Sequence, residues 1–128
     1  MPFSAGIEAG ADFVTVSHNI VKAIDANNPA SLSPAVNQIL RNDLDFKGVI
    51  ITDDLSMDAI ATYYHGDYPA TVQAVLAGNN MLIVSDYKTA FDEIKNAVTS
   101  GVISEELINE RITPILDLKY KKQMRLTR

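Results

Sequence analysis

The chain has 128 residues, no cysteine and a formal net charge of −5 at pH 7. Its length is that of one domain, enough to bury about two-thirds of its unfolded surface. The lack of cysteine excludes disulfides and thiolate metal sites but suits either redox compartment, so localisation stays open. An acidic balance without a lysine–arginine stripe argues against nucleic-acid binding, and no apolar run approaches the roughly 20 residues that a membrane-spanning helix needs.

The N-terminal segment predicts a helix followed by a strand. Residues 2–8 predict a short helix that begins with a proline and stops at Gly10, a residue suited to a left-handed conformation. Residues 13–16 (FVTV) then predict a buried strand. His18 follows directly after the end of this strand, where its side chain could reach a cleft.

A loop and a second helix come next. Residues 25–29 are a loop by composition, being rich in aspartate, asparagine and proline. Ser33 and Pro34 predict the N-cap and the first turn of a helix. Four apolar residues then recur at helical spacing and predict one buried face: Val36, Ile39, Leu40 and Leu44.

The central feature is an apolar run that ends in two aspartates. Residues 48–52 (GVIIT) are largely β-branched and show no polar alternation, which predicts a parallel strand buried on both faces. Asp53 and Asp54 follow at once. In barrels and open α/β sheets, chemistry is done at the carboxyl ends of the strands. The pattern therefore predicts a buried strand that presents an acid to a cleft.

The second half repeats the design of the first. Residues 59–64 predict one or two helical turns, and residues 71–76 predict a helix that Gly78 ends. Residues 77–85 echo residues 9–17: each has Ala-Gly, two connecting residues, four strand residues and a serine. Recurrent helix–glycine–strand units predict parallel strands joined by right-handed crossovers.

Two helices complete the chain. Residues 89–100 predict an amphipathic helix that stops at Gly101, and Ser104 predicts the cap of a final helix. Pro114 lies inside this last helix and is expected to kink or divide it. The chain thus predicts an α/β fold of about three parallel βα units plus C-terminal helices.

Three segments, in order, carry a family resemblance: residues 9–18 (AGADFVTVSH), 29–34 (PASLSP) and 45–57 (DFKGVIITDDLSM). They resemble glycoside hydrolase family 3, and most closely its β-N-acetylglucosaminidase (β-hexosaminidase) branch, from about residue 2 to about residue 118. The resemblance implies that residues 1–128 are a single-domain, C-terminal part of the family's catalytic barrel. Because a (β/α)8 barrel has eight strands and usually about 250 residues, we expect a partial barrel.

The resemblance assigns the catalytic nucleophile to Asp53. In a retaining glycosidase this carboxylate attacks the anomeric carbon while a second group protonates the leaving oxygen. The alternative is that an aspartate caps the following short helix, and Asp54 is assigned to capping or to local hydrogen bonding. His18 and Met57 are expected to line the substrate site, with a purely structural role as the alternative for each.

One family element is absent from the sequence. The resemblance implies an acid/base histidine paired with an aspartate on an earlier loop, and a Lys-His pair that grips the sugar. Neither motif occurs in the 128 residues. We therefore expect the acid/base group to be missing from this chain; His18 does not replace it, and His65 is expected to be exposed. The implied mechanism requires no metal or cofactor.

The implied reaction is retaining hydrolysis of terminal β-linked N-acetylglucosamine from amino sugars such as peptidoglycan fragments. A β-glucoside or xyloside is the first alternative, although residues 53–57 favour the amino sugar because the glucosidase branch usually has an aromatic residue after the nucleophile. The second alternative is an inactive fragment that acts as a folding or assembly module. Because a three-stranded sheet has two unpaired edges, we expect self-association or pairing with an upstream barrel half.

Overall fold

The computed structural model describes residues 2–126 and contains a three-stranded parallel sheet in the order β1-β2-β3. The strands are β1 (Phe13–Val16), β2 (Val49–Asp54) and β3 (Met81–Ile83). Val14 of β1 pairs with Ile50, and Val16 pairs with Thr52. The predicted α/β class and the parallel pairing are therefore confirmed, with β2 as the central strand.

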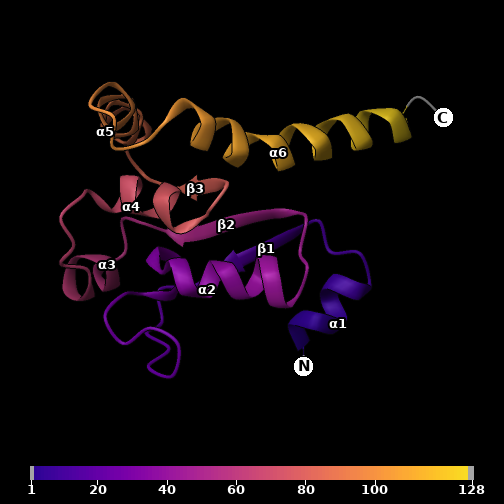
Figure 1. Ribbon diagram of the computed structural model, residues 1–128, viewed down its shortest axis with the longest axis horizontal. Coiled ribbons are helices and arrows are strands. Elements are labelled where there is room, and N and C mark those ends of the chain that lie inside the picture. Colours follow the sequence, from indigo (N-terminus) through magenta and orange to yellow (C-terminus); the bar gives the residue numbers. More distant parts are fainter. Residues whose placement is uncertain (1, 127–128) are drawn as a thin grey trace.

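Helices connect and cover the strands (Figure 1). They are α1 (Pro2–Glu8), η1 (Ala30–Leu32), α2 (Pro34–Gln38), η2 (Ile39–Asp43), α3 (Asp58–Tyr63), α4 (Ala70–Ala77), α5 (Tyr87–Thr99) and α6 (Glu105–Leu126). In the view of Figure 1, α1 and α2 lie below the strands, and α5 and α6 lie above them. The helix η2 continues α2 with a widened π turn, in which the Leu44 N–H donates to Ile39 O at 3.0 Å.

The predicted helix boundaries follow from local chemistry. The expected stops all have positive φ: +91° at Gly10, +123° at Gly78 and +82° at Gly101. The Ser33 hydroxyl caps α2 by accepting from Val36 N at 3.4 Å, and Pro34 occupies the first turn. The Ser104 hydroxyl accepts from Leu107 N at 3.1 Å at the start of α6.

The core lies between the helices and the strands. The helices α2 and η2 cover one face of β1 and β2, where Val14, Val16, Ala30, Leu40, Phe46 and Ile50 pack together. A second cluster joins the end of β2 to α3 and α4 through Leu32, Leu55, Ile60 and Ala74. A third joins α4 to α5 through Val72, Val75, Ala97 and Ile103.

Two strand predictions need correction. Residues 13–16 were predicted to be buried, but Phe13 is 47% exposed; β3 is similarly open, with Met81 at 37% and Ile83 at 41% exposure. The reason is that β1 and β3 are edge strands, in which alternate residues are exposed, so within residues 2–126 only one face of each is well covered. The central strand also runs two residues beyond the predicted end, so that Asp53 and Asp54 belong to β2.

The division of the last helix expected at Pro114 does not occur. The helix α6 continues through this residue for 22 residues, because a proline removes one backbone N–H and the turns on either side can still form. Within residues 2–126, no helix combines the length and the apolar character needed to cross a membrane.

Candidate functional site

A cavity of about 610 Å³ opens at the carboxyl ends of β1 and β2. Its lining residues are Ser17, His18, Asn19, Ile20, Asp53, Met57, Ala59 and Tyr63. The three residues predicted from sequence come from separate segments: His18 after β1, Asp53 in β2 and Met57 at the start of α3. The fold brings all three to one cavity, at the edge of the sheet where the sequence predicted a cleft.

One oxygen of the Asp53 carboxylate accepts a hydrogen bond from the backbone, and the other accepts none from the described residues. The Asp54 backbone N–H donates to Asp53 Oδ1 at 2.8 Å. In the part of the chain that the structure describes, Oδ2 has no hydrogen-bond donor. The N-cap of α3 is Met57, with no side-chain cap, so neither aspartate caps this helix. The side chain of Asp53 is thus oriented but half-buried beside the cavity.

Asp54 makes the local hydrogen bonds that were predicted for it. Its Oδ1 accepts from the Ser56 hydroxyl at 2.7 Å and from the Ser56 N–H at 2.9 Å. These two hydrogen bonds lower the pKa of the Asp54 carboxyl. Asp54 therefore shapes the turn that leaves β2, while Asp53 lines the cavity.

The Asp53 position coincides with an irregularity in the sheet. The register of β2 against β3 shifts between Ile51, which pairs with Met81, and Asp54, which pairs with Ile83. The fully buried Thr52 hydroxyl accepts from Ile83 N at 3.1 Å, where a regular ladder would use a backbone carbonyl. Bulges of this kind bend a strand and re-aim side chains, often beside functional sites.

His18 is only 7% exposed, and the protein occupies both of its ring nitrogens. Nε2 lies 2.8 Å from the backbone oxygen of Asp54, and Nδ1 lies 2.7 Å from the Ser31 hydroxyl. His18 therefore reaches the cavity with its ring while its polar atoms bind to the protein. Sequence reasoning missed Ser31, although it lies inside the PASLSP segment (residues 29–34) that carried part of the resemblance.

The outer wall of the cavity is apolar and open. Met57, the N-cap of α3, and Tyr63, the last residue of α3, are both exposed and line this wall. Tyr63 was missed, because the sequence around it predicted no more than one or two helical turns. His65 is exposed, as expected, and is not among the cavity residues.

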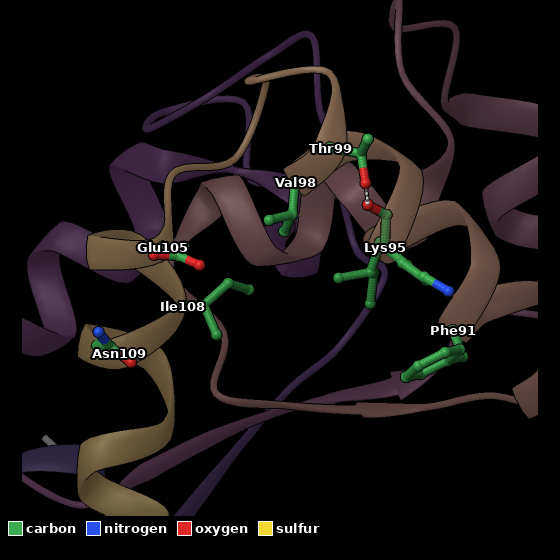
Figure 2. Close-up of a pocket in the computed structure, with 8 residues that line it drawn as sticks. Phe91, Lys95, Val98, Thr99, Glu105, Ile108 and Asn109 are labelled. Carbon is green, nitrogen blue, oxygen red and sulfur yellow. Dashed lines mark hydrogen bonds between the residues drawn. The ribbon is translucent and has the colours of Figure 1, made fainter.

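A second cavity, of about 530 Å³, lies between α5 and α6 (Figure 2). In Figure 2, Phe91, Lys95, Val98 and Thr99 come from α5, and Glu105, Ile108 and Asn109 come from α6. Lys95 and Glu105 are its ionisable groups, and it contains none of the predicted site residues. In the part of the chain that the structure describes, no three histidine, aspartate or glutamate side chains are grouped so as to hold a metal ion.

Known proteins with similar sequences are glycosidases by name. A protein named beta-hexosaminidase from Stenotrophomonas maltophilia (strain K279a) is 39% identical over 99 residues, which are 77% of this chain and 29% of that protein. A beta-hexosaminidase from Nitrosomonas eutropha is 37% identical over 93 residues, 73% of this chain and 26% of that protein. The chain thus spans less than a third of these curated relatives.

Solved structures and a family model agree with these relatives. A glycoside hydrolase family 3 β-N-acetylglucosaminidase from Paenibacillus sp. str. FPU-7 superposes with a TM-score of 0.86 at 38% identity, over 95% of this chain and 24% of that one. A β-N-acetylhexosaminidase from Beutenbergia cavernae has a TM-score of 0.75 at 29% identity, over 91% of this chain and 36% of that one. The family model described as the glycosyl hydrolase family 3 N-terminal domain matches residues 1–118. This chain belongs to glycosyl hydrolase family 3.

Proposed function

We propose that this chain supplies the nucleophile side of a retaining β-N-acetylhexosaminidase site, with Asp53 as the nucleophile. The observation that carries the proposal is that Asp53, His18 and Met57 line one cavity at the carboxyl ends of β1 and β2. The names of the relatives support the reaction class and the amino-sugar substrate. His18 and Met57 are proposed as walls of the substrate site.

The proposed chemistry has two steps at the Asp53 carboxylate. Oδ1 is held by the Asp54 N–H, so Oδ2 is the oxygen that attacks the anomeric carbon. The bond from that carbon to the leaving oxygen breaks as a general acid protonates the leaving oxygen. Water, deprotonated by the same group, then attacks the glycosyl-enzyme, which restores Asp53 and retains the anomeric configuration.

The general acid is proposed to come from outside these 128 residues. Both ring nitrogens of His18 are bound to the protein, and His65 is exposed outside the cavity. Neither histidine is therefore placed to protonate a leaving group. Asp54 is also unsuited to this role, because its hydrogen bonds with Ser56 lower the pKa of its carboxyl, and a general acid must carry a proton near neutral pH.

We also propose that residues 1–128 form the C-terminal part of a catalytic barrel and pair with an upstream half. Apolar side chains on the open face of the sheet support this, with Phe13 in β1 and Met81 and Ile83 in β3 all exposed. A largely apolar groove of about 500 Å³ is also lined by β1 and by residues of α1, α2 and η2, among them Phe3, Val36 and Leu40. Surfaces of this kind mark sites of association.

A second candidate is a folding or assembly module without activity. The uncovered edges of β1 and β3 favour it, because two copies of this chain could pair through them. A β-glucoside or β-xyloside remains the alternative substrate. Hydrolysis assays distinguish these candidates, because each enzyme candidate would hydrolyse a different glycoside and an inactive module would hydrolyse none.

Reconstitution tests the proposal. The chain would be mixed with the upstream two-thirds of the Stenotrophomonas relative. Release of nitrophenol would then be compared for three substrates: the nitrophenyl β-N-acetylglucosaminide, β-glucoside and β-xyloside. We expect hydrolysis of the first substrate, its loss with Asp53→Asn and its persistence with Asp54→Asn. A mixture that elutes as one complex but hydrolyses none of the three would contradict the proposal and favour the assembly module. Faster hydrolysis of a glucoside or xyloside would instead reassign the sugar.

A further inference from the structure

We propose that His18 is a positioning residue for the Asp53 carboxylate. His18 acts through the backbone of Asp54 and is itself oriented by Ser31. The inference rests on the proposed function in so far as Asp53 is the nucleophile. The hydrogen bonds that carry it connect the end of β1 to the end of β2, and they involve no substrate.

The peptide between Asp54 and Leu55 is held from three directions. Its carbonyl oxygen accepts from His18 Nε2 at 2.8 Å and from the Met57 N–H at 3.1 Å. Its N–H, which belongs to Leu55, donates to Ile83 O of β3 at 2.9 Å. This peptide therefore joins β1, the cavity wall and β3 at one point.

The preceding peptide orients the nucleophile. Its N–H, which belongs to Asp54, donates to Asp53 Oδ1 at 2.8 Å. A shift of Asp54 would move this donor and with it the carboxylate. Asp54 still pairs with Ile83, but the ladder is irregular just before it, because the register of β2 against β3 shifts between Ile51 and Asp54. His18 thus supplies, from β1, a hydrogen bond at the position where the sheet is irregular.

The hydrogen-bond chemistry fixes the tautomer of His18. A backbone carbonyl only accepts, so Nε2 must carry a proton, and in the neutral ring Nδ1 accepts from the Ser31 hydroxyl. Ser31 is fully buried; its N–H donates to Ser17 O at 3.0 Å, and its carbonyl accepts from Asn79 Nδ2 at 2.7 Å. The ring nitrogens of His18 and the hydroxyl of Ser31 are thus all hydrogen-bonded inside the protein, and buried hydrogen bonds of this kind restrict motion, as orientation of a nucleophile requires.

The first test measures labelling of Asp53 by a 5-fluoro-N-acetylglucosaminyl fluoride in the reconstituted mixture. We expect His18→Leu to lower the maximal labelling rate about 100-fold, the cost of a misplaced reacting group, and to change the reagent concentration for half-maximal rate far less, because the ring nitrogens of His18 bind the protein. His18→Gln can place an amide N–H near the Nε2 position and should recover most of the rate. Ser31→Ala should give a smaller loss, and His65→Leu should give none.

The second test needs no activity and uses amide hydrogen exchange of the chain alone. We expect His18→Leu to speed exchange at the Asp54 and Leu55 N–H groups about tenfold, and not at Asn80, whose N–H donates to Ile50 O at the opposite end of β2. Wild-type labelling rates in His18→Leu would overturn the inference. Loss of labelling with unchanged exchange would also overturn it, since His18 would then act on the sugar directly. If the wild-type mixture does not label but exchange changes as expected, the proposed function fails while the positioning contact stands.

Discussion

Arg41 and Asn80 meet at the amino end of β2, where the Arg41 guanidinium donates to Asn80 Oδ1 at 2.6 Å. The same amide oxygen accepts from Ile50 N at 2.8 Å, and Asn80 Nδ2 donates to Arg111 O at 2.8 Å. Burial and the nearby Arg111 charge lower the pKa of Arg41. At the end of the sheet opposite the cavity, the side chain of Asn80 therefore connects β2 to η2 and to α6.

Asn80→Ala is expected to destabilise the chain by about 1–3 kcal/mol, because it leaves the buried Ile50 N–H and Nη2 of Arg41 without their acceptor. Nη1 of Arg41 keeps its bonds to Phe46 O and Gly48 O. Urea unfolding followed by circular dichroism measures the effect. Asn96→Ala, on the exposed face of α5, is the matched control and should change stability by no more than about 0.5 kcal/mol. An equal effect of both substitutions would show that Asn80 is not a structural junction.

Asp25 should make the stability of the loop at residues 25–33 depend on pH. Desolvation acts to raise the pKa of Asp25, but hydrogen bonds from Asn28, Ser33 and Asn27 outweigh it and lower the pKa below its ordinary value of 3.8. The unfolded chain therefore binds the proton more readily, so this stabilisation is present above the ordinary value and is lost as the pH falls through the folded value.

We expect Asp25→Asn to be less stable than the wild type at pH 7, by about 1–2 kcal/mol for the lost hydrogen bonds to a charged acceptor. The difference between the two proteins should shrink as the pH falls below 3.8. Urea midpoints measured from pH 7 to pH 3 give this difference directly. A gap that stays constant over the whole range would exclude the charged form of Asp25 as its cause.

Gly78 is expected to resist substitution. Its φ is +123°, and a Cβ added there would lie 3.0 Å from Asn37 Cβ. Gly78→Ala should therefore cost about 1–3 kcal/mol. Gly6→Ala is the matched control, because Gly6 lies inside α1 and a Cβ added there would meet nothing within 4 Å; it should be neutral or stabilising by up to about 1 kcal/mol. Thermal unfolding midpoints of both variants test this prediction, and an equal midpoint for the two would contradict it.

Thr52 links the stability of the sheet to the site. Thr52→Val keeps the shape but removes the acceptor for Ile83 N, which should destabilise the chain by about 1–3 kcal/mol and slow labelling of Asp53. Thr52→Ser retains the hydroxyl and should keep most of the labelling rate despite the loss of a methyl group. If Thr52→Ser labels as slowly as Thr52→Val, the hydroxyl is not what supports the site.

Local signals in the sequence predicted much of this fold. The positive φ at Gly10, Gly78 and Gly101 and the cap by Ser33 follow from residue chemistry within a few positions. The burial of β1 was overestimated, because burial depends on which neighbours cover a strand. The extra length of β2 depends likewise on pairing with β3.

The candidate site was predictable only in part. Asp53, His18 and Met57 could be selected because each follows or ends a strand in a segment that resembles the family. Ser31 could not, since its contact with His18 spans 13 residues and forms only when the loop between β1 and α2 folds back. Tyr63 could not either, because its place in the cavity depends on where α3 packs.

The most direct test of the account is peptide mapping of the chain after incubation with a 5-fluoro-N-acetylglucosaminyl fluoride. Fluoride leaves with little acid assistance, so labelling depends less than hydrolysis on the general acid that we propose lies outside these residues. If Asp53 is the nucleophile, we expect one sugar adduct, located on Asp53 by fragmentation, absent from Asp53→Asn and present in Asp54→Asn. An adduct on Asp54 or elsewhere, or no adduct under conditions that label the full-length Stenotrophomonas relative, would contradict it.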